Sequence, residues 1–172
     1  AAPKDAAQDV SIETGFRVSW KAVTGATQYY YSFSSDDKTY TAESLTGNGG
    51  KDTFVNIVNK DVLKPGTVYY VKIRAFNGAY SEAVKVKAAT APLAPKTIAQ
   101  TVATSTSVTL TWDASAGATG YQIRFGTTAA TAKDIQKIST TSCKLTGLEP
   151  DSKYYVAIYP VIAVTKDFYA SH

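Results

Sequence analysis

Few residues of this chain have side chains that could perform chemistry. The one histidine, His172, is the last residue, so no Ser-His or Cys-His pair can form inside a folded site and no histidine cluster can ligate a metal. Cys143 is the only cysteine, which excludes an intrachain disulfide. Alternation places Cys143 on the same strand face as Leu145, which indicates a small buried hydrophobe instead of a reactive thiol. The sequence therefore predicts neither an enzyme nor a cofactor.

The acidic residues predict turns instead of acid-base catalysis or metal binding. Asp36 and Asp37 follow two serines, where solvated turn carboxylates are common. The segment Gly47–Asp52 is similar to a calcium-binding Gly/Asp repeat, but one imperfect copy predicts a flexible loop without metal. Arg-Gly-Asp tripeptides and Asn-x-Ser/Thr sequons are absent from the sequence.

Composition and charge indicate a globular chain that neither binds nucleic acid nor inserts into a membrane. Hydrophobic residues make up 44% and charged residues 19%, and no apolar run is long enough to cross a bilayer. The formal net charge of +4 divides evenly, with eleven Lys or Arg against nine acids before residue 93 and seven against five after it. A nucleic-acid-binding arm would instead cluster its basic residues.

One pattern of residues occurs twice, so the chain consists of two copies of one domain. The copies lie 92 residues apart at the tryptophan and 85 apart at the Tyr-Tyr pair, a period that suits a small independent domain. The pattern reads Trp20, Gly25-Ala26, Tyr29, Leu63-Lys64-Pro65 and Tyr69-Tyr70, and again Trp112, Gly117-Ala118, Tyr121, Leu148-Glu149-Pro150 and Tyr154-Tyr155. An Ala/Pro stretch at residues 88–95 separates them, which predicts a boundary near Thr90, domains 1–90 and 91–172, and an end-to-end arrangement with limited swing.

Within each copy, apolar and polar residues alternate as in strands that bury one face. The segments Phe16–Trp20 and Val108–Trp112 show this period of two, as do Tyr29, Tyr31 and Phe33. Turn-forming residues separate such segments, and no segment predicts an amphipathic helix. The fold class predicted is all-β.

These motifs resemble those of fibronectin type III domains, twice over and across nearly the whole chain. The first copy has the family's complete Leu-x-Pro-Gly-Thr-x-Tyr signature at Leu63–Tyr69, whereas the second keeps Leu, Pro and Tyr and loses the Gly. The resemblance implies two consecutive immunoglobulin-like β-sandwiches in which the signature tyrosine forms the tyrosine corner. It makes four residues structural: Trp20, Tyr69, Trp112 and Tyr154.

Two features suggest an exported protein. The spacing from Trp through Gly-Ala to Tyr is similar to that of fibronectin type III copies in secreted bacterial proteins. The start Ala1-Ala2-Pro3-Lys4 fits a mature N-terminus left after export, although a cloned fragment would look the same. We therefore expect an extracellular or cell-surface location.

The outward face of one sheet is the candidate partner surface. If Tyr69, Val71 and Ile73 point inward, their neighbours form an aromatic and basic stripe, a composition enriched at binding hot spots. The alternative is that these are ordinary solvent-facing residues of high β-propensity. The candidates are Tyr30, Tyr70, Lys72, Arg74 and Lys85 in the first domain, and Arg124, Tyr155 and Tyr159 in the second.

The second domain has a short final strand, Phe168–His172, next to a strongly apolar segment. An incomplete sandwich favours acceptance of a strand from another chain, so we predict a strand-accepting edge at Val161, Ile162, Ala163 and Val164. The alternative is that the sequence is truncated or that its ordered region simply ends early.

Three functions follow from these features. The first is a non-catalytic extracellular tandem module that acts as a spacer or docks a protein or glycan partner. The second is a structural subunit of an extracellular filament that self-associates by β-strand complementation. The third, an accessory domain of a polysaccharide-degrading enzyme, rests on family association alone.

Overall fold

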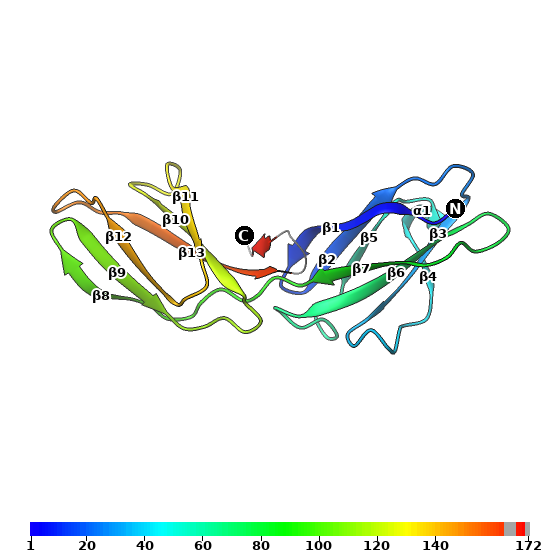
Figure 1. Cartoon of the computed structure of the whole chain (residues 1–172), viewed down its shortest axis with the longest axis horizontal. Helices are drawn as coiled ribbons and strands as arrows, with labels where there is room; N and C mark the ends of the chain where they lie inside the picture. The colour runs from blue at the N-terminus through cyan, green and yellow to red at the C-terminus, as the bar shows by residue number, and fades with distance from the viewer. Residues whose placement is uncertain (164–167, 171–172) are drawn as a thin grey trace.

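The computed structural model shows two β-sandwiches joined end to end along the long axis (Figure 1). It describes residues 1–163 and 168–170, with the backbone alone for Asp134, Ile135 and residues 168–170. No helix in that part of the chain is long and apolar enough to span a membrane. The predicted all-β class with two consecutive sandwiches is confirmed.

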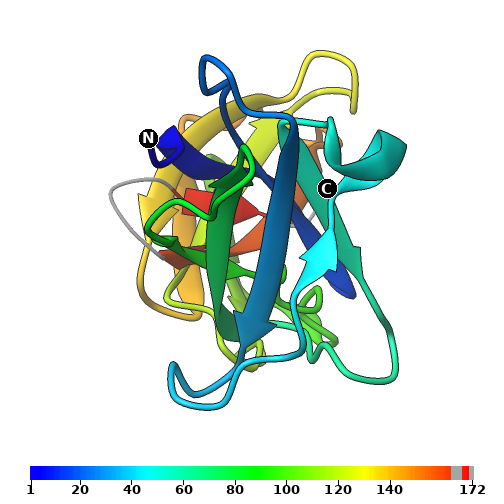
Figure 2. The ribbon, with the colours of Figure 1, turned by 90° about the vertical axis from the view of Figure 1, so that its right-hand side faces the viewer.

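The first domain packs a three-stranded sheet on a four-stranded sheet (Figure 2). The smaller sheet runs β1 (Lys4–Ile12), β2 (Gly15–Lys21), β5 (Phe54–Val58). The larger runs β4 (Ser44–Leu45), β3 (Gln28–Ser34), β6 (Val68–Phe76), β7 (Val84–Ala89), and its pairings are antiparallel. The loop predicted to be flexible contains a short helical turn, α1 (Gly47–Gly50), with left-handed backbone at Asn48 and Gly49.

The second domain repeats this architecture with a shorter last strand. One sheet runs β12 (Ser142–Thr146), β9 (Ser107–Trp112), β8 (Ile98–Thr104). The other runs β11 (Lys133–Ile138), β10 (Gly120–Gly126), β13 (Tyr155–Ala163), β14 (Phe168–Ala170). Strand β14 occupies the sheet position of β7, but it has 3 residues where β7 has 6.

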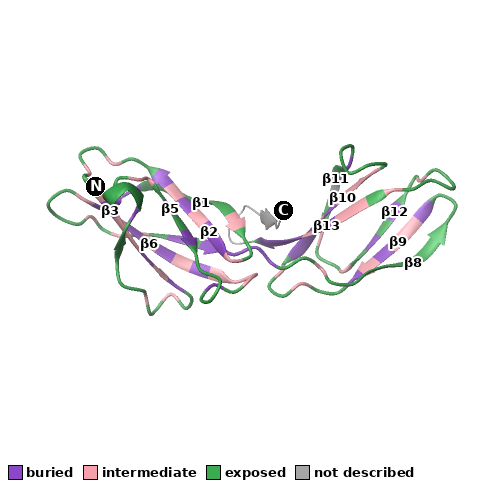
Figure 3. Cartoon of the chain, turned by 180° about the vertical axis from the view of Figure 1, so that it is seen from behind, coloured by how far each residue is buried: buried purple, intermediate pink, exposed green. Residues whose placement is uncertain are grey.

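Buried and exposed residues alternate along the strands as predicted from the sequence, and the buried ones form the core of each domain (Figure 3). Trp20 packs edge-on against Tyr29 with ring centroids 5.5 Å apart, and the equivalent pair Trp112 and Tyr121 is 5.3 Å apart. These four aromatic side chains are buried, as the structural role that the resemblance implies for the two tryptophans requires.

Both predicted tyrosine corners form. The hydroxyl of Tyr69 accepts a hydrogen bond of 2.8 Å from the backbone N–H of Lys64, and that of Tyr154 accepts one of 2.7 Å from Glu149. Tyr69 is buried, but Tyr154 is only half-buried.

The junction between the domains is packed closely. Thr90 and Ala91 have no exposed surface, and the Ala91 N–H donates to the Ile12 carbonyl at 2.9 Å while the Gly66 N–H donates to the Ala91 carbonyl at 3.0 Å. Across the junction, the backbone of Gly66 lies against that of Ala116 and Gly117. These contacts support limited swing between the domains, and the boundary near Thr90 stays a prediction.

Candidate functional site

The first domain carries its aromatic and basic residues on the outward face of the β3–β6–β7 sheet. Register places Tyr30 opposite Arg74, and Lys72 opposite Lys85. Tyr70 lies opposite Lys87, whose Nζ is 5.8 Å from the tyrosine ring centroid. Along β6 the outward residues are half-buried and the inward ones buried, as a two-sided strand requires. The structure thus brings together all five first-domain candidates: Tyr30, Tyr70, Lys72, Arg74 and Lys85.

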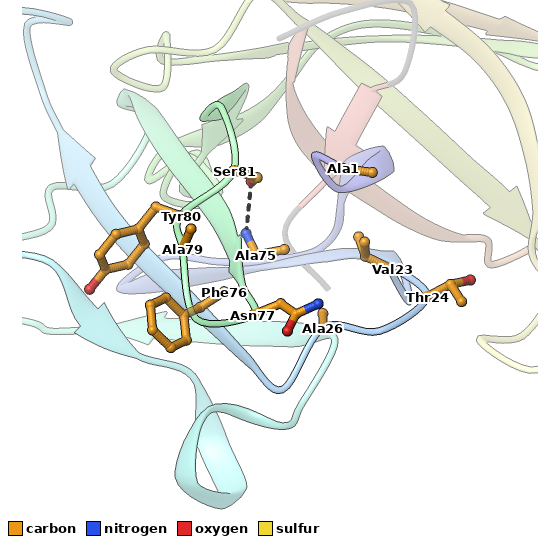
Figure 4. A pocket seen from close by; sticks show the side chains of 10 residues that line it. All are labelled: Ala1, Val23, Thr24, Ala26, Ala75, Phe76, Asn77, Ala79, Tyr80 and Ser81. Atoms are coloured by element: carbon orange, nitrogen blue, oxygen red, sulfur yellow. Dashed lines mark hydrogen bonds between the residues drawn. The ribbon is translucent and has the colours of Figure 1, made fainter.

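An aromatic cluster lies at one end of this face, and Figure 4 shows two of its rings, Phe76 and Tyr80, side by side. The ring of Tyr80 lies 5.2 Å from Tyr30 and 5.0 Å from Phe76, and half of its surface is exposed (50%). Arg74 lies over Tyr80 at 5.9 Å and pairs with Glu43 at 3.4 Å. Arginine and tyrosine are among the residue types enriched at protein-binding hot spots, and an arginine over an aromatic ring gains a favourable cation–π contact.

At the other end, a loop covers part of the face with a hydrogen-bonded network. Lys72 Nζ lies 3.8 Å from the ring centroid of Tyr40. The Tyr40 hydroxyl donates to Asp37 Oδ1 at 2.6 Å, and Lys85 Nζ donates to Asp37 Oδ2 at 2.7 Å. Burial and the bond to Asp37 raise the pKa of Tyr40 to about 12. Asp37 therefore attaches the loop to the sheet.

Asp36 does form the predicted turn. Its Oδ1 accepts hydrogen bonds of 2.8 Å from the backbone N–H groups of Lys38 and Thr39. These bonds lower the pKa of the carboxyl, with the Thr39 bond as the largest cause. Asp36 has a structural task that needs no acid-base chemistry.

We expect the loop to stay attached at neutral pH and to detach in acid. Hydrogen bonds from Lys85, which is the largest cause, and from Tyr40 lower the pKa of Asp37 below 3.8. The stabilisation that the Asp37 carboxylate gives to the loop is therefore present above pH 3.8 and is lost as the pH falls through the lowered pKa. An NMR titration that resolves the Tyr40 ring from the other tyrosines should place its ionisation near 12 in the wild type. Asp37→Asn should move this midpoint down, whereas Asp61→Asn, in an exposed turn, should leave it in place. An unchanged midpoint in Asp37→Asn would contradict the network.

The second domain places its candidates on the equivalent face but surrounds them differently. Tyr155 lies opposite Gly126 and is 40% exposed, and Tyr159 lies opposite Gln122. Arg124 lies opposite Ala157, and Ala157 is the residue equivalent to Lys72 of the first domain. The Arg124 guanidinium lies within 3.5 Å of the Ala132 carbonyl oxygen. The dense basic stripe is thus a property of the first domain, and the three second-domain candidates do not reproduce it.

Comparison with known proteins identifies the second half of the chain. The fibronectin type III domain model matches residues 93–170. This half is a fibronectin type III domain. The match covers nearly all of it, including the Leu148–Tyr154 segment that lacks the signature glycine.

Solved structures show the same fold for the whole chain. The FN1–FN3 domains of chicken CNTN1, a contactin, are similar at 19% identity with a TM-score of 0.58, over 100% of this chain and 62% of that one. A two-domain fibronectin type III segment of chicken tenascin shares 24% identity over 100% of this chain and 95% of that one, with a TM-score of 0.48. The chain thus spans less than two thirds of the contactin segment. The contactin likeness and the strand order together show two consecutive fibronectin type III folds.

The described residues of these fibronectin type III folds offer no metal-binding cluster. Among them, no group of three His, Cys, Asp or Glu residues could hold a metal ion. Cys143 is buried opposite Leu110, and burial raises the pKa of its thiol, so the predicted hydrophobic role is confirmed. The described surface can contact a partner through aromatic rings, cationic side chains and strand edges.

Three residues of the predicted strand-accepting edge pair within the chain. Val161, Ile162 and Ala163 pair with β14, and Val164 lies outside the described residues. Acceptance of a strand from another chain stays a prediction. A groove of about 590 Å³ lies between β8 and the start of β13, where Tyr154 and Val156 line it.

Several residues of the candidate partner surface could not be found from strand alternation in the sequence. Tyr40 and Tyr80 lie outside the long strands, and Glu43 and Asp37 reach the face from loops. Gln100 lines the groove of the second domain, and its position can be matched in the sequence, because Gln8 and Gln100 each stand 12 residues before the tryptophan of their domain.

Proposed function

We propose that this chain is a non-catalytic module that spaces and docks a larger protein, using the outward face of β3, β6 and β7 to hold a protein partner. The observation that carries the proposal is the arrangement of Tyr30, Arg74 and Tyr80, in which the arginine lies over the half-exposed ring of Tyr80 and that ring packs against Tyr30. Fibronectin type III domains are typically non-catalytic binding or spacer modules, which supports this class of function. An extracellular location and a bacterial origin are part of the proposal and rest on the sequence resemblance.

Site-specific photo-crosslinking tests the docking face. A benzophenone amino acid replaces Tyr80 on the face or Val58 on the opposite sheet, because both side chains are well exposed, at 50% and 60%. In cells of the native host, position 80 should give adducts with one discrete partner, and Arg74→Ala should remove them. Equal adducts at both positions, or adducts insensitive to Arg74→Ala, would contradict the proposal.

A filament subunit that assembles by β-strand complementation is the second candidate, and the edge strand β8, whose Ile98 and Val102 are exposed, favours it. Light scattering after size exclusion separates the two. A species of 18.3 kDa supports the docking module. A ladder of larger species supports strand exchange between copies.

A further inference from the structure

Cations gather on the outward face of the first domain. Lys72 and Arg74 stand on β6, and Lys85 and Lys87 stand on β7. Lys72 and Lys85 lie directly opposite each other in the ladder between the two strands. Like charges in such a cross-strand pair destabilise a sheet, so folding alone does not favour this arrangement. An anion beside the two lysines would stabilise it.

The chain places carboxylates of its own beside these cations. Lys85 Nζ donates to Asp37 Oδ2 at 2.7 Å, and Arg74 pairs with Glu43 at 3.4 Å. Both acids belong to the loop of residues 35–43 between β3 and β4, which covers part of the face. A stretch of polypeptide that carries spaced carboxylates therefore fits the cations of this face.

The ion pair that holds this loop can be exchanged for one with a partner. The Lys85 and Asp37 side chains are 50% and 31% exposed, and exposed ion pairs stabilise little because water and salt screen them. When Lys85 changes partner, the loop loses its bond through Asp37. Tyr40 then leaves Lys72, whose Nζ lies 3.8 Å from the ring centroid. Both lysines become available to a partner together.

Lys87 extends the row of cations along β7. Its Nζ lies 5.8 Å from the ring centroid of Tyr70, and it is exposed. Among the described residues, no carboxylate forms an ion pair with Lys87. The second domain has Ala157 at the position of Lys72 and Tyr159 at that of Arg74, so the row belongs to the first domain.

We propose that the docking face binds an acidic segment of a partner polypeptide, whose carboxylates replace Asp37 at Lys85 and pair with Lys72 and Lys87. In the unbound chain, the loop of residues 35–43 occupies the face in place of the partner and lowers the affinity for it. A polypeptide is favoured over a phosphate or sulfate polymer because the chain's own ligands here are carboxylates on a peptide backbone. This inference rests on the docking function proposed above, and it adds the chemistry of the partner and the regulation of the same face.

A peptide of alternating glutamate and serine, about ten residues long, is the probe. Titrated to about 1 mM into the ¹⁵N-labelled chain in about 0.15 M salt, it should shift the amide signals of Lys72, Lys85 and Lys87 and leave those of the second domain unchanged. Asp37→Asn should strengthen binding about threefold, because the loop no longer competes for the lysines. Asp61→Asn changes the net charge equally in an exposed turn, so it is the matched control and should leave the affinity unchanged.

Changes at the lysines test the row from the other side. Lys85→Gln combined with Lys87→Gln should weaken binding about tenfold, whereas Lys60→Gln, in an exposed turn, should not weaken it. Absence of shifts on the face, equal effects of the two Asp→Asn changes, or tighter binding of an oligothymidylate of equal length to this face would overturn the proposal. If Tyr80 position crosslinks still depend on Arg74 in that case, the docking function stands and the acidic partner alone is wrong. Loss of both results would remove the docking function as well.

Discussion

Val71→Asp should unfold the first domain, whereas the same change at the equivalent Val156 should leave the second domain folded. Val71 has no exposed surface and lies under β7, opposite Val86. A carboxylate there has neither water nor a cation, so we expect the free energy of unfolding to fall by at least about 4 kcal/mol, most of what a small domain has. Val156 is half-buried and borders the groove, where its carboxylate can reach solvent, so we expect a loss of about 1–2 kcal/mol.

Each domain carries its own optical probe for this comparison. Trp20 and Trp112 are the two tryptophans of the chain, one in each core. Urea unfolding followed by fluorescence in Trp112→Phe and Trp20→Phe backgrounds therefore reports the first and the second domain separately. Equal losses at the two positions would mean that Val156 is covered as Val71 is.

The sequence was sufficient for the fold because the signals that define it are local. Alternation at Phe16–Trp20 and Val108–Trp112 requires one buried face, and the repeated Leu-x-Pro and Tyr positions predict the same corner twice. The outward stripe Tyr70, Lys72 and Arg74 follows from the inward one by the same period. The resemblance to fibronectin type III domains added the sandwich architecture, which period alone does not determine.

The parts that the sequence left open depend on contacts between distant segments. Tyr80 joins Tyr30 only because the turn after β6 folds back over the sheet, and Tyr40 reaches Lys72 only through its loop. The pairing of Val161–Ala163 with β14 is likewise a contact between separate segments, which the apolar content of this stretch does not reveal.

The spacer role depends on the junction, and one glycine there should control it. Gly117 has φ +76°, and a methyl group added to it would overlap the backbone of Gly66 in the other domain, whose Cα lies 2.7 Å from the added carbon. Gly25 occupies the same turn position in the first domain, with φ +80°, and an added methyl would meet only Asn77 Nδ2 at 3.4 Å. Both Gly→Ala changes carry the backbone strain of a left-handed residue, about 1 kcal/mol. Only Gly117→Ala also forces the domains apart.

We therefore expect Gly117→Ala to release the second domain from the first, with Gly25→Ala as the matched control. In the wild type and in Gly25→Ala, residual dipolar couplings of the two domains should fit one alignment tensor, because the junction holds them as one body. In Gly117→Ala the tensors should differ in magnitude, and small-angle scattering should show a broader range of maximum dimensions. A common tensor in Gly117→Ala would mean that the linker alone, through Ala91 and its bonds to Ile12 and Gly66, fixes the angle between the domains.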